Sequence, residues 1–249
     1  MYSSDNNNLH DHKIQADQIL DLIESLGDDQ LTAYFKQMDY TDKEKLSYRL
    51  LDAIQEEDLE TVKNLIKAGA DVNITNDDGN SPLLLASTDN TVRSSSYLEK
   101  TKILEELIKA GADVNVRNIK GDTALIISCF YSNYDNIWEL IKVGADVNIQ
   151  NRYGETALMV SIIQEDSYSF DQILKVSANI NITDSYGRTA LIYAVMRQNL
   201  YMTHELMKRG ADVNVRDKNG LTAMDHLDRK FGPETDELIN ILKQTGAHE

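Results

Sequence analysis

A seven-residue segment recurs along this chain at a fixed interval, and that interval constrains the fold more than any other feature. Residues 109–115 read Lys-Ala-Gly-Ala-Asp-Val-Asn, and nearly the same letters stand at 67–73, 142–148 and 208–214. A degraded copy at 175–181 reads Lys-Val-Ser-Ala-Asn-Ile-Asn. The glycine position falls at 111, 144, 177 and 210, one copy every 33 residues. A fixed period in this range indicates a repeat array.

A second motif, Gly-x-Ser/Thr-Ala/Pro-Leu/Met, stands a few residues after the copies of the first. Its glycine suits the positive φ of a tight turn, and the hydroxyl residue two positions later is a preferred helix N-cap. The Leu or Met begins a buried face. The five versions start at Gly79, Gly121, Gly154, Gly187 and Gly220. Each of the five repeats after the first is therefore predicted to contain a loop followed by a capped helix.

The two motifs together, at this period, make the sequence similar to the ankyrin repeat, a hairpin loop followed by two antiparallel helices. The resemblance implies an all-α repeat solenoid of stacked helix-turn-helix units with short β-hairpin loops. Six repeats are expected, at about 46–75, 76–117, 118–150, 151–183, 184–216 and 217–249, with the first and last acting as caps. Ahead of them we expect a disordered tail at 1–10 and an N-terminal helical extension at 11–45.

Three departures from the family pattern lead to expectations of their own. The family usually has His after the first-helix Leu, and here apolar packing is expected to replace it in all but the last repeat. The residues at that position are Leu84, Ile126, Met159, Ile192 and Asp225. In the repeat at 151–183, Ser177 and Asn179 replace the usual Gly and Asp, so that helix end is expected to lack a glycine C-cap. The second repeat carries extra residues within 87–98, expected to form a polar surface loop whose role stays open.

Composition limits the classes of function. The formal net charge is −16, and residues 1–60 hold 15 Asp and Glu against 5 Lys and Arg. Such acidity opposes binding to nucleic acid through phosphate neutralisation. No segment approaches the roughly 18 to 20 apolar residues that span a bilayer, and the polar N-terminus does not resemble a secretory signal. The single cysteine, Cys129, excludes an internal disulfide and suits a reducing compartment, so we expect a cytoplasmic location.

Convergent reactive groups, which an enzyme needs, are not found in the sequence. The five histidines are scattered, and Cys129 is expected to be a small core residue rather than a nucleophile. The repeated Asp and Asn of the first motif could suggest calcium sites. Their spacing is tied to the loop in every copy, which favours hydrogen bonds to the loop backbone instead. We therefore expect no catalytic activity, no cofactor and no metal.

Function is expected in the surface residues that do not repeat. The resemblance implies that loop tips and first helices line a concave face, which in this family usually binds another protein. At these positions the third to fifth repeats place aromatic residues, Met and Arg, the types enriched at binding hot spots, and the tips from the third repeat onward are basic. The candidate partner-binding residues are Arg117, Ile119, Lys120, Phe130, Tyr131, Arg152, Tyr153, Ile163, Tyr186, Arg188, Met196, Arg197 and Lys218.

The leading hypothesis is a non-catalytic protein–protein interaction module, monomeric when alone, that binds a partner protein on this concave face. One alternative is a dedicated inhibitor or immunity protein that occludes a toxin enzyme, and another is a secreted bacterial effector that captures a host protein. Two further classes stay open: an enzyme with residues 1–45 as its catalytic part, and nucleic-acid binding through the basic tips. The second is opposed by the acidic residues that interrupt the basic stripe, Asp77, Asp78, Asp122 and Glu155.

Overall fold

The computed structural model describes residues 18, 40–88, 96–176, 178–227 and 232–244. The expected tail at 1–10 lies outside these residues, as do most of the extension at 11–45 and residues 89–95 of the long loop. The described residues form helices joined by loops, with no strand among them. They fall into two compact parts, an N-terminal part, Met1–Ile119, and a C-terminal part, Lys120–Glu249. Each part has its own helix packing.

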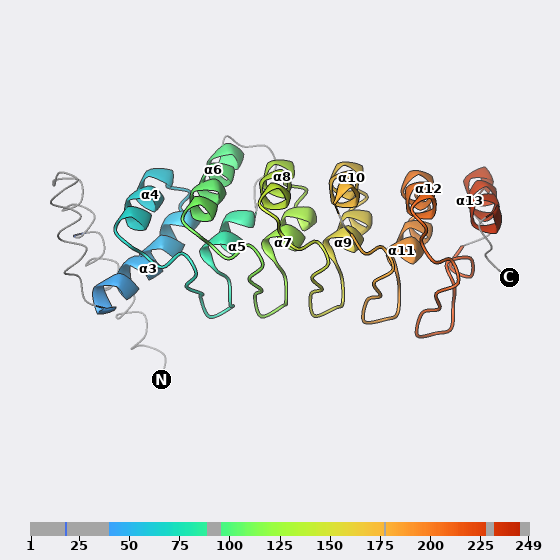
Figure 1. Cartoon of the computed structure of the whole chain (residues 1–249), viewed down its shortest axis with the longest axis horizontal. Helices are drawn as coiled ribbons and strands as arrows, with labels where there is room; N and C mark the ends of the chain where they lie inside the picture. The colour runs from blue at the N-terminus through green and yellow to red at the C-terminus, as the bar shows by residue number, and fades with distance from the viewer. Residues whose placement is uncertain (1–17, 19–39, 89–95, 177, 228–231, 245–249) are drawn as a thin grey trace. The chain divides into compact units, whose positions relative to one another are not determined.

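The N-terminal part contains two helix pairs. Its described helices are α3 (Tyr40–Gln55), α4 (Leu59–Lys67), α5 (Pro82–Ser87) and α6 (Ser96–Lys109). Helix α3 packs on α4 and on α5, and α6 packs on α5 and on α4 (Figure 1). Because α3 begins at Tyr40, one continuous helix crosses the expected boundary between the extension and the first repeat.

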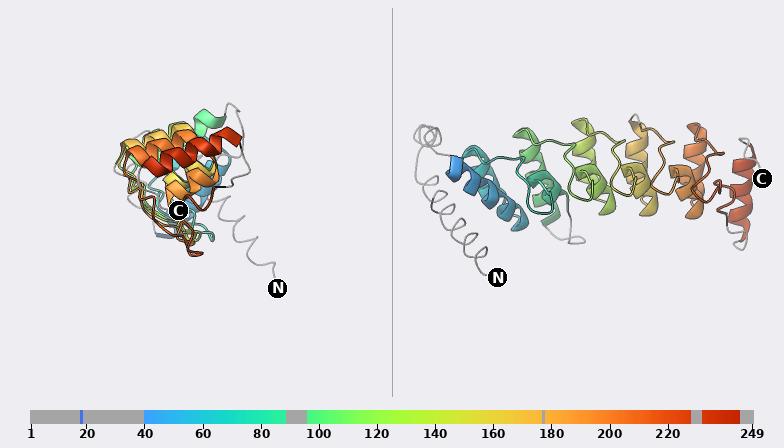
Figure 2. Two further views of the ribbon diagram at one scale, coloured as in Figure 1. Left: turned by 90° about the vertical axis from the view of Figure 1, so that its right-hand side faces the viewer. Right: turned by 90° about the horizontal axis from the view of Figure 1, so that it is seen from below.

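The C-terminal part also consists of packed helix pairs. Its described helices are α7 (Ala124–Phe130), α8 (Tyr134–Lys142), α9 (Ala157–Ile163), α10 (Ser167–Lys175), α11 (Ala190–Met196), α12 (Leu200–Lys208) and α13 (Gly232–Gln244). The inner helices α7, α9 and α11 form one layer, and the outer helices α8, α10 and α12 form a second (Figures 1 and 2). The loops extend from the inner layer on the side away from the outer helices. The expected solenoid of stacked helix pairs is confirmed within each part.

Side-chain caps begin a helix at four of the five second-motif copies, whereas the residues after Thr222 form turns rather than the predicted helix. The hydroxyl of Thr156 accepts a hydrogen bond from the Met159 N–H, and Thr189 accepts one from the Ile192 N–H, at 3.4 and 3.3 Å. Ser81 and Thr123 cap α5 and α7 in the same way. Such a cap satisfies one of the amide groups that a helix N-terminus leaves without a partner, which fixes where each inner helix starts.

The inner helices are short and almost wholly buried. In α7 every residue from Ala124 to Cys129 is buried, and only Phe130 at its end reaches solvent. Burial raises the pKa of the Cys129 thiol, so the group stays protonated and packs as a small apolar side chain. This confirms the expected packing role of Cys129. No helix in the described part of the chain is long and apolar enough to cross a membrane.

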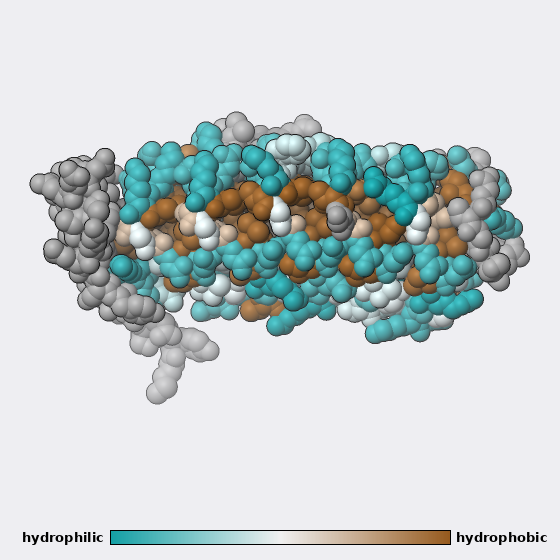
Figure 3. Space-filling view, in the orientation of Figure 1, coloured by the Kyte–Doolittle hydropathy of each residue, from teal (hydrophilic) through white to brown (hydrophobic). Residues whose placement is uncertain are grey.

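The Asp and Asn side chains of the first motif hold the loops together, as the sequence predicts. Asp146 Oδ1 accepts the Asn148 N–H at 2.9 Å, and Asn148 Oδ1 accepts the Asn179 N–H of the next repeat at 2.7 Å. Asn181 continues the series by accepting the Asp212 N–H at 3.0 Å. Each loop therefore braces itself and its neighbour through a side-chain oxygen. On the face seen in Figure 3, each part shows a band of hydrophobic residues between hydrophilic ones.

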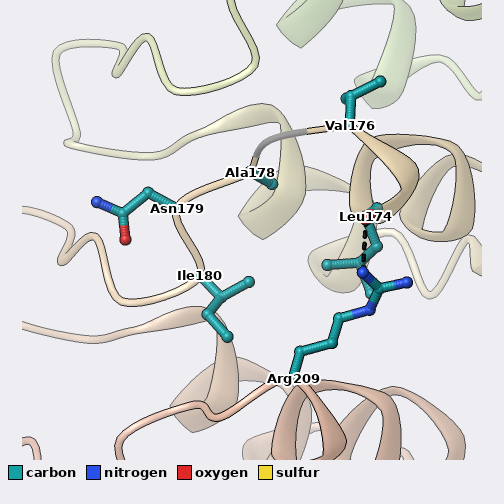
Figure 4. Close-up of a pocket in the computed structure, with 6 residues that line it drawn as sticks. All are labelled: Leu174, Val176, Ala178, Asn179, Ile180 and Arg209. Carbon is teal, nitrogen blue, oxygen red and sulfur yellow. Dashed lines mark hydrogen bonds between the residues drawn. The ribbon is translucent and has the colours of Figure 1, made fainter.

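The fourth repeat departs from its neighbours at the end of α10. In the repeats on either side, Gly144 and Gly210 of the first motif follow α8 and α12 with φ near +89° and +83°. Helix α10 instead ends at Lys175, the backbone of Val176 that follows is extended, and Ser177 lies outside the described residues. Arg209 of the next repeat donates from Nη1 to the Leu174 carbonyl oxygen at 2.8 Å (Figure 4). A side chain from the following repeat thus takes one of the carbonyl groups that a glycine cap would satisfy.

Candidate protein-interaction surface

The loop tips of the C-terminal part are joined to one another through their backbones. Arg152 N–H donates to the Lys120 carbonyl at 2.9 Å, and Ser185 N–H donates to the Tyr153 carbonyl at 2.8 Å. Lys218 N–H donates to the Tyr186 carbonyl, also at 2.8 Å. One hydrogen bond therefore links each tip to the next, which aligns Lys120, Tyr153 and Tyr186 at the same position of successive tips. We call this series of tips the tip row.

A buried aspartate organises the tip of the fifth repeat. Asp184 Oδ1 accepts the N–H groups of Tyr186 and Arg188, each at 2.8 Å. Its Oδ2 accepts the Tyr193 hydroxyl at 2.7 Å and Arg188 Nε at 3.0 Å. The Arg188 guanidinium lies over the Tyr186 ring at 4.6 Å and over the Tyr193 ring at 4.7 Å. Arg188 therefore holds the Tyr186 ring in place, in addition to any contact that it makes with a partner.

In the neighbouring tips, the residue equivalent to Asp184 has different hydrogen-bond partners. In the fourth repeat Asn151 Oδ1 accepts the Tyr153 and Glu155 N–H groups, and its amide nitrogen donates to Asp122 at 3.1 Å. In the sixth repeat Asp217 Oδ1 accepts two tip N–H groups, and Oδ2 lies 2.9 Å from His226 Nε2. Burial alone would raise the pKa of Asp217, but these hydrogen bonds outweigh it and lower the pKa. A buried side-chain oxygen thus supports each tip.

The ends of the inner helices present a second series of exposed residues, which we call the helix-end row. Phe130 of α7, Ile163 of α9 and Met196 of α11 stand at equivalent positions, 33 residues apart. Phe130 and Met196 are exposed, and Ile163 is half-buried. The Phe130 and Tyr131 rings meet edge to face with centroids 5.1 Å apart. These residues end the inner helices, which form the layer from which the loops extend.

Some basic side chains of this surface are paired with carboxylates, which the sequence alone does not show. Arg188 is paired with Asp184 at 2.9 Å, and Arg197 lies 3.7 Å from Glu165. Arg152 and Lys218 are exposed at the tips. Asp122, one of the acidic residues that interrupt the basic stripe in the sequence, is half-buried, and burial raises its pKa above the usual value. The tips therefore keep exposed cations, but fewer than the number of basic residues suggests.

Eleven of the thirteen candidate residues belong to the C-terminal part, and two do not. Arg117 and Ile119 belong to the N-terminal part, where the Ile119 N–H donates to the Asp78 carbonyl at 3.1 Å. Both are exposed there. The candidate surface described below therefore consists of the tip row and the helix-end row of the C-terminal part.

Two groups of residues were not singled out by the sequence analysis. The first is the buried tip series Asn151, Asp184 and Asp217, whose signal is recurrence three residues before each second-motif glycine. The second is a set of exposed aromatic side chains on the outer helices. These are Tyr134, Trp138, Tyr168 and Tyr201. The predicted functional residues lie only on loop tips and first helices, and no role was predicted for aromatic residues of the second helices.

A hollow of about 440 Å³ lies beside the irregular end of α10. It is lined by Leu174, Val176, Ala178, Asn179, Ile180 and Arg209 (Figure 4). Its cationic group, the Arg209 guanidinium, is already bonded to the Leu174 carbonyl. In the described part of the chain, no three His, Cys, Asp or Glu side chains come together as metal ligands would. The hollow has no arrangement of groups that indicates catalysis.

Comparisons with known proteins agree with this geometry. Family models of ankyrin repeats match residues 50–99, 93–184 and 174–227. Among solved structures, the ankyrin repeat domain of Bcl-3, a unique member of the IkappaB protein family, is 25% identical with a TM-score of 0.65. That match covers 80% of this chain and 86% of that chain. EF0377, an ankyrin repeat protein, is 27% identical with a TM-score of 0.66, over 78% of this chain and 96% of that one. No curated protein matches the sequence significantly.

The fold and its loops define the class as a helical repeat solenoid. Since the three family models together span residues 50–227, the chain belongs to the ankyrin-repeat proteins. Ankyrin repeats generally mediate protein–protein interaction and typically serve as non-catalytic scaffolds.

Proposed function

We propose that this protein is a non-catalytic interaction module that binds a partner protein on the concave face of its C-terminal part. The proposal assigns the contacts to the tip row and the helix-end row. Tyr153 and Tyr186 are 60% and 59% exposed, although tyrosine rings usually bury part of their surface. Phe130 and Met196 are exposed on the inner layer. Aromatic side chains on a rigid support are typical anchors of protein interfaces.

The observation that carries the proposal is the way in which Tyr186 is held. Its N–H is bonded to buried Asp184, its carbonyl accepts the Lys218 N–H, and its ring lies against the Arg188 guanidinium. A side chain fixed in this way loses little conformational freedom on binding. An exposed ring that the protein itself immobilises is therefore well suited to a partner-binding role.

The charge of the tips favours one kind of partner. Arg152 and Lys218 are exposed at the tips, whereas the protein as a whole carries a net charge of −16. We expect the bound surface to offer carboxylates to these tips and apolar side chains to the helix-end row. Such complementary charges fix the orientation of a complex and increase its rate of association.

Site-specific photocrosslinking tests the proposed face. A benzophenone amino acid replaces Tyr153 or Tyr186, and in a matched control it replaces Tyr48, an exposed tyrosine of α3 in the N-terminal part. We expect discrete adducts to one protein from the two tip positions and none from position 48. The double variant Tyr153→Ala/Tyr186→Ala should reduce co-purification of that protein by about tenfold or more.

Adducts of equal yield at position 48, or none at either tip, would contradict the proposed face. The identity of the crosslinked protein also distinguishes the alternatives. A toxin enzyme encoded by a neighbouring gene would indicate an inhibitor or immunity protein. A host protein would indicate a secreted effector.

A further inference from the structure

The outer helices of the C-terminal part carry an exposed aromatic patch on their solvent side. Tyr134 and Trp138 of α8, Tyr168 of α10 and Tyr201 of α12 are 42%, 53%, 43% and 47% exposed. Solvent-facing positions of an amphipathic helix are ordinarily polar. The outer layer lies on the opposite side of the inner helices from the loops (Figure 1). We call these four residues together with Asp171 the outer aromatic patch. The patch is separate from the tip row.

The members of the outer aromatic patch are neighbours on packed helices. The Tyr134 and Tyr168 rings lie 4.7 Å apart between centroids. The Tyr201 hydroxyl donates to Asp171 Oδ1 at 2.7 Å, which joins α12 to α10. Helices α8 and α10 pack directly, and Trp138 stands 33 residues before Asp171, at the equivalent position of the preceding repeat. Asp171 of α10 therefore lies between α8, which carries Trp138, and Tyr201 of α12. Packed helix axes lie about 8–10 Å apart, so these side chains are close enough to share one ligand.

Asp171 differs in its partners from Glu139 of α8 and Glu205 of α12. Glu139 and Glu205 lie 3.1 and 3.7 Å from Lys142 and Lys208 on their own helices. Within the described ranges, no cationic nitrogen lies within 4.0 Å of Asp171, whose hydrogen bond comes from the neutral Tyr201 phenol. That hydrogen bond raises the pKa of Tyr201 to about 12, so the phenol remains a donor at neutral pH. The patch therefore combines exposed aromatic faces with a carboxylate that forms no ion pair among the described residues.

We propose that the outer aromatic patch binds an arginine side chain presented by a partner protein. The guanidinium would stack on an aromatic face of Trp138 or Tyr168 and donate hydrogen bonds to the Asp171 carboxylate. Aromatic rings attract cations through the charge distribution of their faces, and arginine suits such a site because it is planar and weakly hydrated. Its N–H groups also match a carboxylate in fork geometry. The overall charge of −16 would favour the approach of a basic segment.

This interaction goes beyond the proposed function, because it uses the opposite layer of the C-terminal part and a partner of opposite charge. A single chain could then contact two proteins, or two regions of one protein, at the same time. The two surfaces can be tested separately, since no residue is shared between the tip row and the outer aromatic patch.

Trp138 provides a direct readout, because it is the only tryptophan in the chain. Its indole N–H gives one resonance in a ¹H–¹⁵N correlation spectrum of the full-length protein. The probes are N-acetylarginine methylamide, the lysine analogue and the citrulline analogue, which keeps the shape of arginine without its charge. We expect a saturable shift with the arginine probe, about threefold or more weaker binding of the lysine probe, and no saturable shift with citrulline.

Two variants with the same change in net charge provide the control. Asp171→Asn should weaken binding of the arginine probe by about threefold to tenfold. Asp77→Asn, at an exposed loop position of the N-terminal part, should leave it unchanged. Tyr201→Phe releases Asp171 from its hydrogen bond and should retain or strengthen binding. Equal binding of citrulline, equal loss in the two Asp→Asn variants, or no saturable shift in the wild-type protein would each overturn the proposal.

Discussion

Replacement of Asp184 by alanine should destabilise the C-terminal part more than replacement of any exposed carboxylate of the repeat loops. The Asp184 side chain is 1% exposed and accepts hydrogen bonds from two backbone N–H groups, the Tyr193 hydroxyl and Arg188. Alanine would leave all of these donors without an acceptor. Tyr193 is itself buried, so water cannot easily replace the lost oxygen.

The magnitude follows from the number of donors left unpaired. Each buried donor without an acceptor costs about 1–3 kcal/mol, and hydrogen bonds to a charged group lie toward the upper end. Losses within one network are not additive, and the partly exposed Arg188 can turn toward solvent. We therefore expect Asp184→Ala to lower the free energy of unfolding by about 3–5 kcal/mol. Asp184→Asn retains an acceptor for the two backbone N–H groups, as Asn151 does in the fourth repeat, and should cost about 1–2 kcal/mol.

Urea denaturation, followed by circular dichroism and by Trp138 fluorescence, measures these differences. The matched control is Asp212→Ala, which removes an exposed carboxylate that accepts one backbone N–H at 2.9 Å and should cost about 1 kcal/mol or less. If Asp184→Ala cost no more than Asp212→Ala, the argument that a buried carboxylate supports the fifth tip would be wrong. The double variant Asp184→Asn/Arg188→Met should cost less than the sum of its single changes, because the two side chains share one interaction.

Three further changes test other parts of the C-terminal part. Gly154→Ala should lower the free energy of unfolding by about 2–4 kcal/mol, because φ is +77° and a Cβ would lie 2.6 Å from the Ser185 nitrogen. The control Gly144→Ala places its Cβ with nothing within 4 Å and should lower the free energy of unfolding by about 1 kcal/mol in the same urea denaturation. Arg209→Met should cost about 1 kcal/mol by removing the hydrogen bond to the Leu174 carbonyl, and an unchanged midpoint would show that this bond does not stabilise α10. The folded state lowers the pKa of Asp217 below its unfolded value of 3.8, so its ionised form stabilises the protein above that pH. That contribution should disappear as the pH falls through the lowered pKa. In the Asp217→Asn variant, the free energy of unfolding should therefore depend less on pH in the acidic range.

The repeat pattern predicted what depends on local interactions. A Thr two residues after a turn glycine caps the helix that follows it, and the cap at Thr156 or Thr189 needs only that short segment. The side-chain hydrogen bonds of the first motif are equally local, with the carboxylate of Asp146 two residues from the amide that it accepts. Such contacts have the same geometry wherever the letters recur, so sequence spacing is sufficient to predict them.

The role of Arg188 could not be predicted in the same way. Sequence pattern treats it as one more basic tip residue, but its partners are brought together by the fold: Asp184 across the turn and Tyr193 on the helix that follows. The outer aromatic patch was missed for a related reason. Trp138 and Tyr168 occupy second helices, where an aromatic residue is as compatible with burial as with exposure, and only the packed structure decides between the two.

The tips of the fourth and fifth repeats present the same side chain with different support, and this difference bears on how a partner is bound. Tyr186 is immobilised by the Arg188 guanidinium, whereas the equivalent position beside Tyr153 holds Glu155, which bonds to Asn151 instead. Ordering Tyr153 on binding should therefore cost more conformational entropy than ordering Tyr186. A rigid ring discriminates between partner shapes, and a less restrained ring adapts to them. We infer that Tyr186 contributes more to affinity and that Tyr153 tolerates more variation in the surface it contacts.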